Sequence, residues 1–112
     1  MDAHDKDVVW LYGKVRTPPF SSAARMEAGF LLRQLQRGVR LGMPQSRPMQ
    51  TIDKRCHELR IIDQNVSWRI MYAIEPDAII ILEVFVKKTG RTPRRIIELC
   101  KKRLRDYDNA SG

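Results

Sequence analysis

Three segments of the chain that are expected to form β-strands carry charged side chains among apolar ones. They are residues 58–60 (Glu-Leu-Arg), residues 68–72 (Trp-Arg-Ile-Met-Tyr) and residues 85–89 (Phe-Val-Lys-Lys-Thr). Neighbours along a strand point to opposite faces of a sheet, so the register decides which of these charges meet. If the apolar residues share one face, the cations gather on the other. The pattern therefore predicts a sheet surface that can hold a phosphate or a similar anion.

Alternation along each strand assigns the residues to the two faces. The core face is expected to hold apolar residues, namely Leu59, Ile61, Trp68, Ile70, Tyr72, Ile74, Ile80, Leu82, Val84 and Val86. The second face then holds most of the charges, namely Glu58, Arg60, Arg69, Met71, Glu83, Phe85 and Lys87. The two glutamates can equally form cross-strand ion pairs with the arginines, and each such pair contributes at most about 1 kcal/mol.

A cluster of cations also needs a group that transfers protons if it is to catalyse a reaction. Glu58 lies on the charged face, and a lysine whose pKa is lowered by neighbouring arginines can act as well. His57 has an ordinary pKa near ~6.5, but alternation puts it on the Leu59 side of the strand. We favour Glu58 for this role and keep His57 as an alternative, since strand ends twist.

The first half of the chain predicts the elements that lie before these strands. Residues 8–12 form a short β-prone run, expected at a sheet edge. Residues 22–37 repeat apolar side chains every three or four positions, which indicates an amphipathic helix capped by Ser21 or Ser22. Residues 38–53 are interrupted by glycine and proline and predict a long loop.

The second half predicts three antiparallel strands and a final helix. The strands are expected at about residues 56–63, 67–74 and 78–87. Thr92 and Pro93 are suited to begin a helix, which is expected to end near residues 106–108. We therefore expect one α+β domain over residues 1–112. It would have a small, mostly antiparallel sheet of four strands, one or two N-terminal helices packed on it and a basic C-terminal helix.

The charge balance favours a polyanionic or acidic partner. The 112 residues include 21 Lys and Arg against 13 Asp and Glu, which gives a net charge of +8. The C-terminal part concentrates the excess, and the cations expected to contact nucleic acid there are Arg91, Arg94, Arg95, Lys101 and Lys102. The cations of the helix can also be read more simply, as a solvent-exposed helix face.

Several classes of protein are disfavoured by what the sequence lacks. Cys56 and Cys100 are the two cysteines and have no metal-ligand spacing, so neither a zinc site nor a disulfide framework is expected. His57-Glu58 does not continue into a zinc-protease motif, because Ile61 stands where the second histidine is required. No Gly-rich phosphate loop is present, and no run approaches the ~18 apolar residues of a membrane span. We expect a cytoplasmic protein without metal or cofactor.

The order and spacing of the charged strands resemble the RelE/ParE toxin superfamily, in particular its phage-derived, HigB-like branch. The likeness covers nearly the whole chain. Its most specific parts are Glu58-Leu59-Arg60, Trp68-Arg69 with Tyr72, and Phe85-Val86-Lys87-Lys88-Thr89 followed by Thr92-Pro93. Further likeness lies in Thr17-Pro18-Pro19-Phe20, in residues 31–36 and in residues 44–49.

The resemblance implies a toxin of a type II toxin–antitoxin system. Such toxins bind the ribosome and cut messenger RNA by metal-free attack of a ribose 2′-hydroxyl on the adjacent phosphate, and a cognate antitoxin, often with a helix-turn-helix domain, silences them. Matching positions give Arg60, Arg69 and either Lys87 or Lys88 as the residues that hold the phosphate. Glu58 departs from RelE, which has a lysine implicated in catalysis there, and the C-terminal catalytic tyrosine of RelE has no clear counterpart in this chain unless Tyr107 serves.

Two other functions fit the same superfamily or the same charge. The ParE-like branch poisons DNA gyrase, but a protein of that kind does not need the concentrated cations at Arg60, Arg69, Lys87 and Lys88. A basic phage-derived module that binds nucleic acid without cutting it is the other alternative. Strongly salt-dependent binding without cleavage would identify that module.

Overall fold

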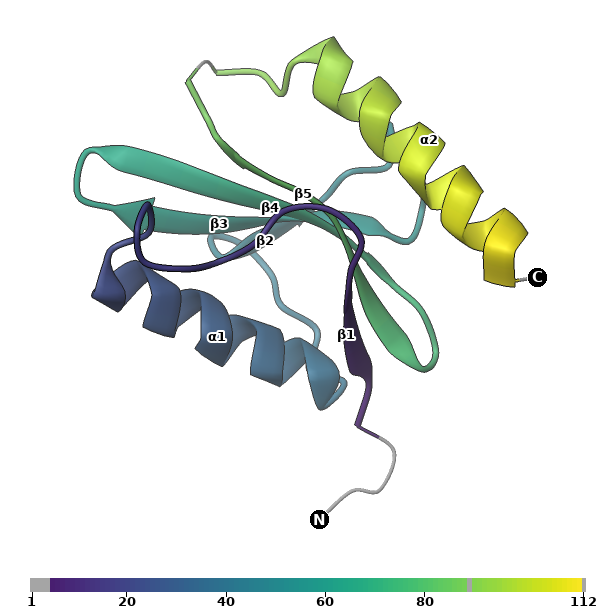
Figure 1. Cartoon of the computed structure of the whole chain (residues 1–112), viewed down its shortest axis with the longest axis horizontal. Coiled ribbons are helices and arrows are strands. Elements are labelled where there is room, and N and C mark those ends of the chain that lie inside the picture. Colours follow the sequence, from purple (N-terminus) through teal and green to yellow (C-terminus); the bar gives the residue numbers. More distant parts are fainter. Residues whose placement is uncertain (1–4, 89, 112) are drawn as a thin grey trace.

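A computed structural model describes residues 5–88 and 90–111 of the chain. Thr89 of the third charged segment therefore lies outside the described residues, as do residues 1–4 and 112. Along the chain the elements are β1 (Asp7–Trp10), α1 (Ser22–Gln36), β2 (Ser46–Pro48), β3 (Cys56–Asp63), β4 (Val66–Ile74), β5 (Ala78–Val86) and α2 (Arg94–Ser111). Figure 1 shows the two helices beside one twisted sheet.

The sheet has five strands in the order β1-β5-β4-β3-β2. The predicted meander of β3, β4 and β5 is antiparallel, as expected, and β1 pairs with β5 in parallel at one edge. The prediction of four strands is wrong, because Ser46–Pro48 forms a short fifth strand inside the expected loop. This strand places Arg47 opposite Glu58.

Helix α1 covers one face of the sheet and, within the described residues, is the single helix before β2. The side chain of Ser21 caps it by accepting a hydrogen bond from the amide of Ala24 at 3.0 Å. Its apolar stripe packs on Phe20 and on the apolar residues of the strands that face it, which are Leu59, Ile61, Trp68, Ile70, Tyr72, Ile79 and Ile81. The prediction that β3 and β4 point Leu59, Ile61, Trp68, Ile70 and Tyr72 to one core is confirmed.

A β-bulge in β5 changes the face to which that strand's residues point. Tyr72 pairs with Ile81 while Met71 pairs with Glu83, so Leu82 is an extra residue between them. Residues after the bulge, such as Val84, point to the α1 side as predicted, but Ile80 and Leu82 point to the other side. The assignment of Ile80 and Leu82 to the same face as Val84 is therefore wrong.

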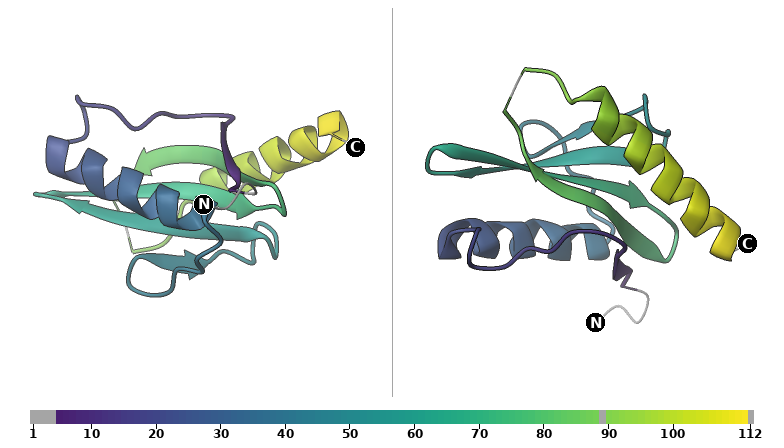
Figure 2. Two further views of the ribbon diagram at one scale, coloured as in Figure 1. Left: turned by 90° about the horizontal axis from the view of Figure 1, so that it is seen from below. Right: turned by 45° about the horizontal axis from the view of Figure 1, so that its top comes forward.

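Helix α2 covers part of the second face, so the sheet separates two cores. Figure 2 shows α1 and α2 on opposite sides of the strands. The apolar stripe of α2, which is made of Ile96, Cys100 and Leu104, packs on Met71, Ala73, Ile80 and Leu82 of the sheet. Alternation had predicted that Met71 lies on the charged face and that Ile80 and Leu82 lie on the opposite, core face. The second face is thus largely apolar beneath α2, apart from an ion pair of Glu83 with Arg103 of the helix, and a charged cluster lies beyond the N-terminal end of α2.

One arginine, Arg55, links the sheet to the C-terminal part of α2 through ion pairs. Arg55 forms ion pairs with Asp53 at 2.9 Å, Glu75 at 2.7 Å and Asp108 at 2.9 Å. Cys56 and Cys100 lie in the core beneath the same helix, and burial raises the pKa of each thiol to about 12. Neither helix within residues 5–88 and 90–111 is long and apolar enough to cross a membrane.

Candidate functional site

Glu58 lies at the centre of the charged end of the second face. It stands on the α2 side of β3, and its carboxylate is 1% exposed. Three cations surround this group: Arg47 Nε is 3.1 Å from Oε1, Arg69 Nε is 3.4 Å from Oε1, and Lys87 Nζ is 3.8 Å from Oε2. The hydroxyl of Thr92 donates a hydrogen bond to Oε2 at 3.1 Å. Four groups from four different segments therefore converge on one buried carboxylate.

Each partner reaches Glu58 because of how the strands pair. Arg47 of β2 and Met71 of β4 stand opposite Glu58 on either side of it, and Arg69 is two residues before Met71 on the same face. Lys87 comes directly after β5, where its amide donates to the carbonyl of Ser67 at 2.8 Å. The register of the sheet, rather than any continuous motif, thus assembles the cluster.

Arg69 is far less accessible than a surface cation. Its side chain is 6% exposed, and its Nη1 donates hydrogen bonds to the hydroxyl of Ser67 and to the carbonyl of Trp68. Burial lowers the pKa of the guanidinium, and the charge of Glu58 opposes that effect. Arg69 is therefore a buried partner of Glu58 and not a cation on an open sheet surface.

Lys87 is similarly enclosed. Its side chain is 8% exposed, and Nζ donates a hydrogen bond to Thr92 Oγ1 at 3.4 Å. Burial lowers the pKa of the ammonium group most strongly, Glu58 raises it, and the nearby arginines Arg47 and Arg69 lower it further. A lysine with a lowered pKa in a largely enclosed site is suited to transfer protons.

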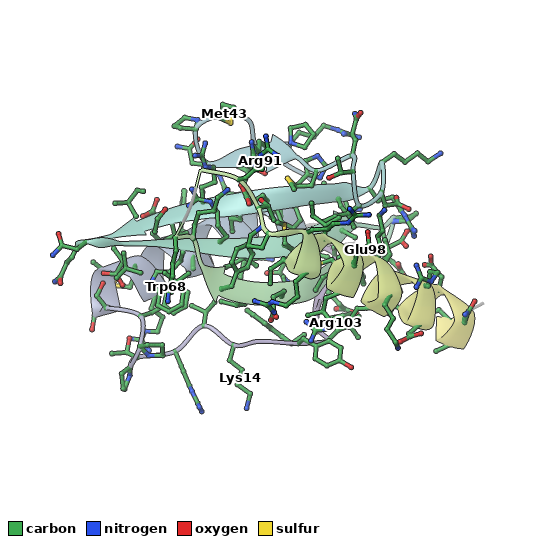
Figure 3. The ribbon with its side chains drawn as sticks, turned by 90° about the horizontal axis from the view of Figure 1, so that it is seen from above. Lys14, Met43, Trp68, Arg91, Glu98 and Arg103 are labelled. Atoms are coloured by element: carbon green, nitrogen blue, oxygen red, sulfur yellow. The ribbon has the colours of Figure 1, made fainter. Side chains whose placement is uncertain are left out.

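An open hollow of about 610 Å³ adjoins the cluster. Arg47 and Thr92 belong both to its lining and to the contacts of Glu58, and Arg91 adds a further cation. Its remaining wall is made of apolar and small polar residues, namely Pro48, Met49, Gln50, Thr51, Gly90 and Ile97. In Figure 3, Arg91 lies toward the same edge of the molecule as Met43. The hollow can therefore admit an anion to the exposed side of the cations.

Residues 19–105 match the family described as "Phage derived protein Gp49-like (DUF891)". The chain belongs to this family. The match includes every residue of the Glu58 cluster and both helices up to Arg105. The Gp49-like family is part of the RelE/ParE-like toxin superfamily, so a relation to toxin–antitoxin systems is supported. No curated protein matches the chain.

The other cations predicted on this face of the Gp49-like chain lie around the cluster. Arg60 stands opposite Arg69 in the register, and its Nη1 is 3.8 Å from the sulfur of Met43. Lys88 is exposed directly after Lys87. Arg60 and Arg69 therefore place two like charges opposite each other next to the Glu58 cluster, and like charges in that arrangement repel.

The cations predicted to contact RNA divide into two groups along α2. Arg94 and Arg95 are exposed in the first turn, close to Arg91 and the hollow. Lys101 lies 3.6 Å from Glu98, and Lys102 lies 2.7 Å from Asp106, about two turns farther along the helix. The first group is therefore better placed than the second to contact an anion at Glu58, and contact of either with RNA remains a prediction.

Two side chains considered for proton transfer lie elsewhere. His57 is on the α1 side of β3, as alternation predicted, with its ring 5.5 Å from that of Tyr72. Burial lowers the pKa of His57, and Arg40 lowers it further. Tyr107 packs against the second core from the C-terminal part of α2. Neither side chain is among the contacts of Glu58.

Sequence reasoning missed two members of the cluster. Arg47 lay in a segment with prolines at positions 44 and 48, where no strand was predicted. Thr92 was interpreted as a helix cap, but its hydroxyl donates to Glu58 and α2 begins at Arg94. The one signal for Arg47 was its position just before a proline, as a cation that could pair with a glutamate of a neighbouring strand. Without a structure, such a signal is weak evidence for an ion pair.

Proposed function

We propose that this Gp49-like protein is the toxin of a type II toxin–antitoxin system, related to the HigB-like branch. In this proposal it is an endoribonuclease that cuts messenger RNA on the ribosome. One observation carries the proposal: Arg47, Arg69 and Lys87 converge on Glu58 at the edge of an open hollow that is also lined by Arg91. The superfamily to which the family belongs supports it.

The substrate phosphate is proposed to occupy the hollow between Arg47 and Arg91. The Arg47 side chain is 39% exposed and can contact the phosphate directly, while Arg69 and Lys87 lie behind it. Fixed cations that stabilise charge developing in the transition state are typically worth about 10²–10³ in rate for each donor. The ribosome would add positioning of the RNA, which lowers the entropic part of the barrier.

The proposed reaction is an internal transfer of the phosphate. The 2′-oxygen attacks the adjacent phosphorus, the bond from phosphorus to the 5′-oxygen breaks, and the products are a 2′,3′-cyclic phosphate and a 5′-hydroxyl. A base removes the proton of the 2′-hydroxyl, and an acid supplies a proton to the leaving 5′-oxygen. Both transfers are proposed to occur where the Glu58 cluster meets the hollow, at Arg47 and Thr92, and Thr92 Oγ1 is 3.4 Å from Lys87 Nζ.

We assign the base to Lys87 in its neutral form and a positioning role to Glu58. Burial and the nearby arginines lower the pKa of Lys87, which increases its neutral fraction near neutral pH. Glu58 was the favoured base from the sequence, but its carboxylate is 1% exposed and is held by three cations and a hydroxyl. Those contacts suit a group that orients its neighbours better than one that meets substrate.

Cleavage in a purified translation system tests the activity. Wild-type protein would be incubated with a messenger RNA, with ribosomes present or omitted, and cuts would be mapped by primer extension. Cuts that require ribosomes and leave 5′-hydroxyl ends are expected. Absence of cuts under every condition, combined with inhibition of DNA gyrase in a supercoiling assay, would contradict the proposal.

A further inference from the structure

A second hollow, of about 500 Å³, lies at the β1 edge of the sheet and carries exposed aromatic rings. Its lining includes Trp10, which is 43% exposed, and Tyr12, which is 48% exposed. Lys14 and Arg16 complete its polar part, and both are exposed. In Figure 3, Lys14 lies toward the edge opposite to that of Arg91, so this hollow is separate from the one beside Glu58.

The loop that carries these rings is fixed to the sheet. The amides of Leu11 and Tyr12 both donate to the carbonyl of Ile81, at 3.2 and 3.4 Å. Gly13 has φ 88° and lies so close to Val84 that a Cβ atom at this position would be 2.7 Å from Val84 Cγ2. The backbone that carries the rings is therefore held in place before any ligand arrives, which reduces the entropy lost on binding.

A cation–π contact with Arg103 also fixes the ring of Tyr12. The guanidinium of Arg103 lies 3.6 Å from the centroid of that ring. Arg103 is itself held by the carbonyl of Leu82 at 2.8 Å and by Glu83 at 3.3 Å. The β-bulge that exposes these two groups to α2 thus also orients Tyr12.

We propose that Trp10 and Tyr12 form a platform on which bases of single-stranded RNA stack, with Lys14 and Arg16 contacting its phosphates. Aromatic rings that alternate with cations are the usual means of binding single strands without sequence preference. Among the described residues, the lining of this hollow includes no acidic one. A single-stranded RNA offers flat bases for the aromatic rings and phosphates for the cations. A hydrophobic protein surface would offer apolar contacts for the rings but no negative charge for the cations.

The platform rests on the proposed function, since it would bind the same class of substrate, RNA, at a distance from the cleaved bond. It lies on the edge strand β1, three strand positions from Glu58 in β3. At about 4.8 Å between strands, this is a separation of about 14 Å. Bound there, the RNA segment that flanks the cleaved bond would add affinity without taking part in the chemistry.

Binding of a short RNA without ribosomes tests the platform. The probe is an unstructured single strand of about 12 nucleotides, within the range of known single-strand sites. Stacking on Trp10 should quench its fluorescence, while Trp68 gives a constant background because it is stacked on Phe20 and 8% exposed. Trp10→Leu should abolish the quenching and weaken binding about 5- to 150-fold, as expected for loss of one stacked base.

Two variants show whether the binding depends on the platform itself. Phe30→Leu alters an exposed ring, 63% accessible, on α1, and should bind RNA as the wild type does. Arg47→Ala should retain the quenching of Trp10 even though it lacks a cation of the Glu58 cluster. Quenching without any cleavage by the wild-type protein would refute the proposed function and leave the platform supported. DNA of the same sequence shows whether the ribose 2′-hydroxyl contributes.

Two results would overturn the proposal. The first is equal RNA affinity of the wild type and Trp10→Leu. The second is a change in Trp10 fluorescence that follows protein concentration and not RNA, which would make this surface a contact between copies of the chain.

Discussion

Removing the charge of Glu58 is expected to destabilise the fold severely, because this carboxylate neutralises two largely buried cations. In Glu58→Gln the shape is kept, but Arg69 and Lys87, with side chains 6% and 8% exposed, lose their counter-ion. Removing one partner of a buried ion pair lowers the free energy of unfolding by about 3–5 kcal/mol. A domain of this size has only about 5–15 kcal/mol in total.

Urea denaturation followed by circular dichroism measures this loss. With an ordinary dependence of the unfolding free energy on urea, the midpoint should fall by roughly 2 M. Glu98→Gln is the matched control, because Glu98 is 57% exposed and lies 3.6 Å from Lys101. An exposed pair of that kind contributes at most about 1 kcal/mol.

The result also distinguishes the two roles considered for Glu58. If Glu58 were a base that meets substrate and did not hold its neighbours, Glu58→Gln would lose cleavage while keeping its unfolding midpoint. A stability within about 0.5 kcal/mol of the wild type would refute the reasoning about the buried cluster, since surface substitutions have effects of that size.

Three further predictions follow from other contacts. With a neutral lysine as the base, the cleavage rate of the wild type should rise with pH in a range below the ordinary lysine pKa of 10.5. Lys87→Arg keeps the positive charge but cannot titrate near neutrality, so this rise is expected to disappear from its pH–rate profile. Gly13→Ala should lower the free energy of unfolding by about 1 kcal/mol or more because of the positive φ and the clash with Val84, whereas Gly42→Ala, with open space around it, should not; thermal unfolding of both variants would reveal an error here. Hydrogen bonds from the amide of Ser21 and from Trp68 lower the pKa of Asp63, so its contribution is present above the unfolded pKa of about 3.9 and is lost as the pH falls through the folded value. Asp63→Asn should therefore have a lower melting temperature than the wild type at neutral pH, and the difference in melting temperature should shrink in acid. A difference that does not depend on pH would contradict this assignment.

Strand periodicity predicted the parts of the site that lie on regular strands. β3 and β4 pair without interruption from Cys56 to Asp63, so alternation correctly placed Glu58 and Arg69 on one face and His57 on the other. The same reasoning failed in β5, where residues 79–82 are all apolar and carry no alternation from which a bulge could be recognised. The second core beneath α2 was missed for the same reason.

The contacts that complete the cluster depend on tertiary structure. Arg47 belongs to a strand of three residues that is held by its pairing with β3 and not by its own β-propensity. Thr92 has the residue type of a helix cap, and its actual partner is 34 positions away in sequence. Burial of Arg69 could not be inferred either, because it depends on the tertiary contacts of the guanidinium with Glu58, Ser67 and the carbonyl of Trp68.

The rate of ribosome-dependent cleavage by Arg47→Ala, measured beside Arg33→Ala, tests most directly whether the Glu58 cluster is the site. The two arginines are matched, since they are 39% and 45% exposed and each forms one ion pair, with Glu58 at 3.1 Å and with Asp5 at 2.7 Å. Arg33 lies on α1, on the opposite side of the sheet. We expect primer extension to show a loss of about 10²-fold or more for Arg47→Ala and wild-type cleavage for Arg33→Ala. Equal rates for the two variants would contradict a catalytic role for the cluster.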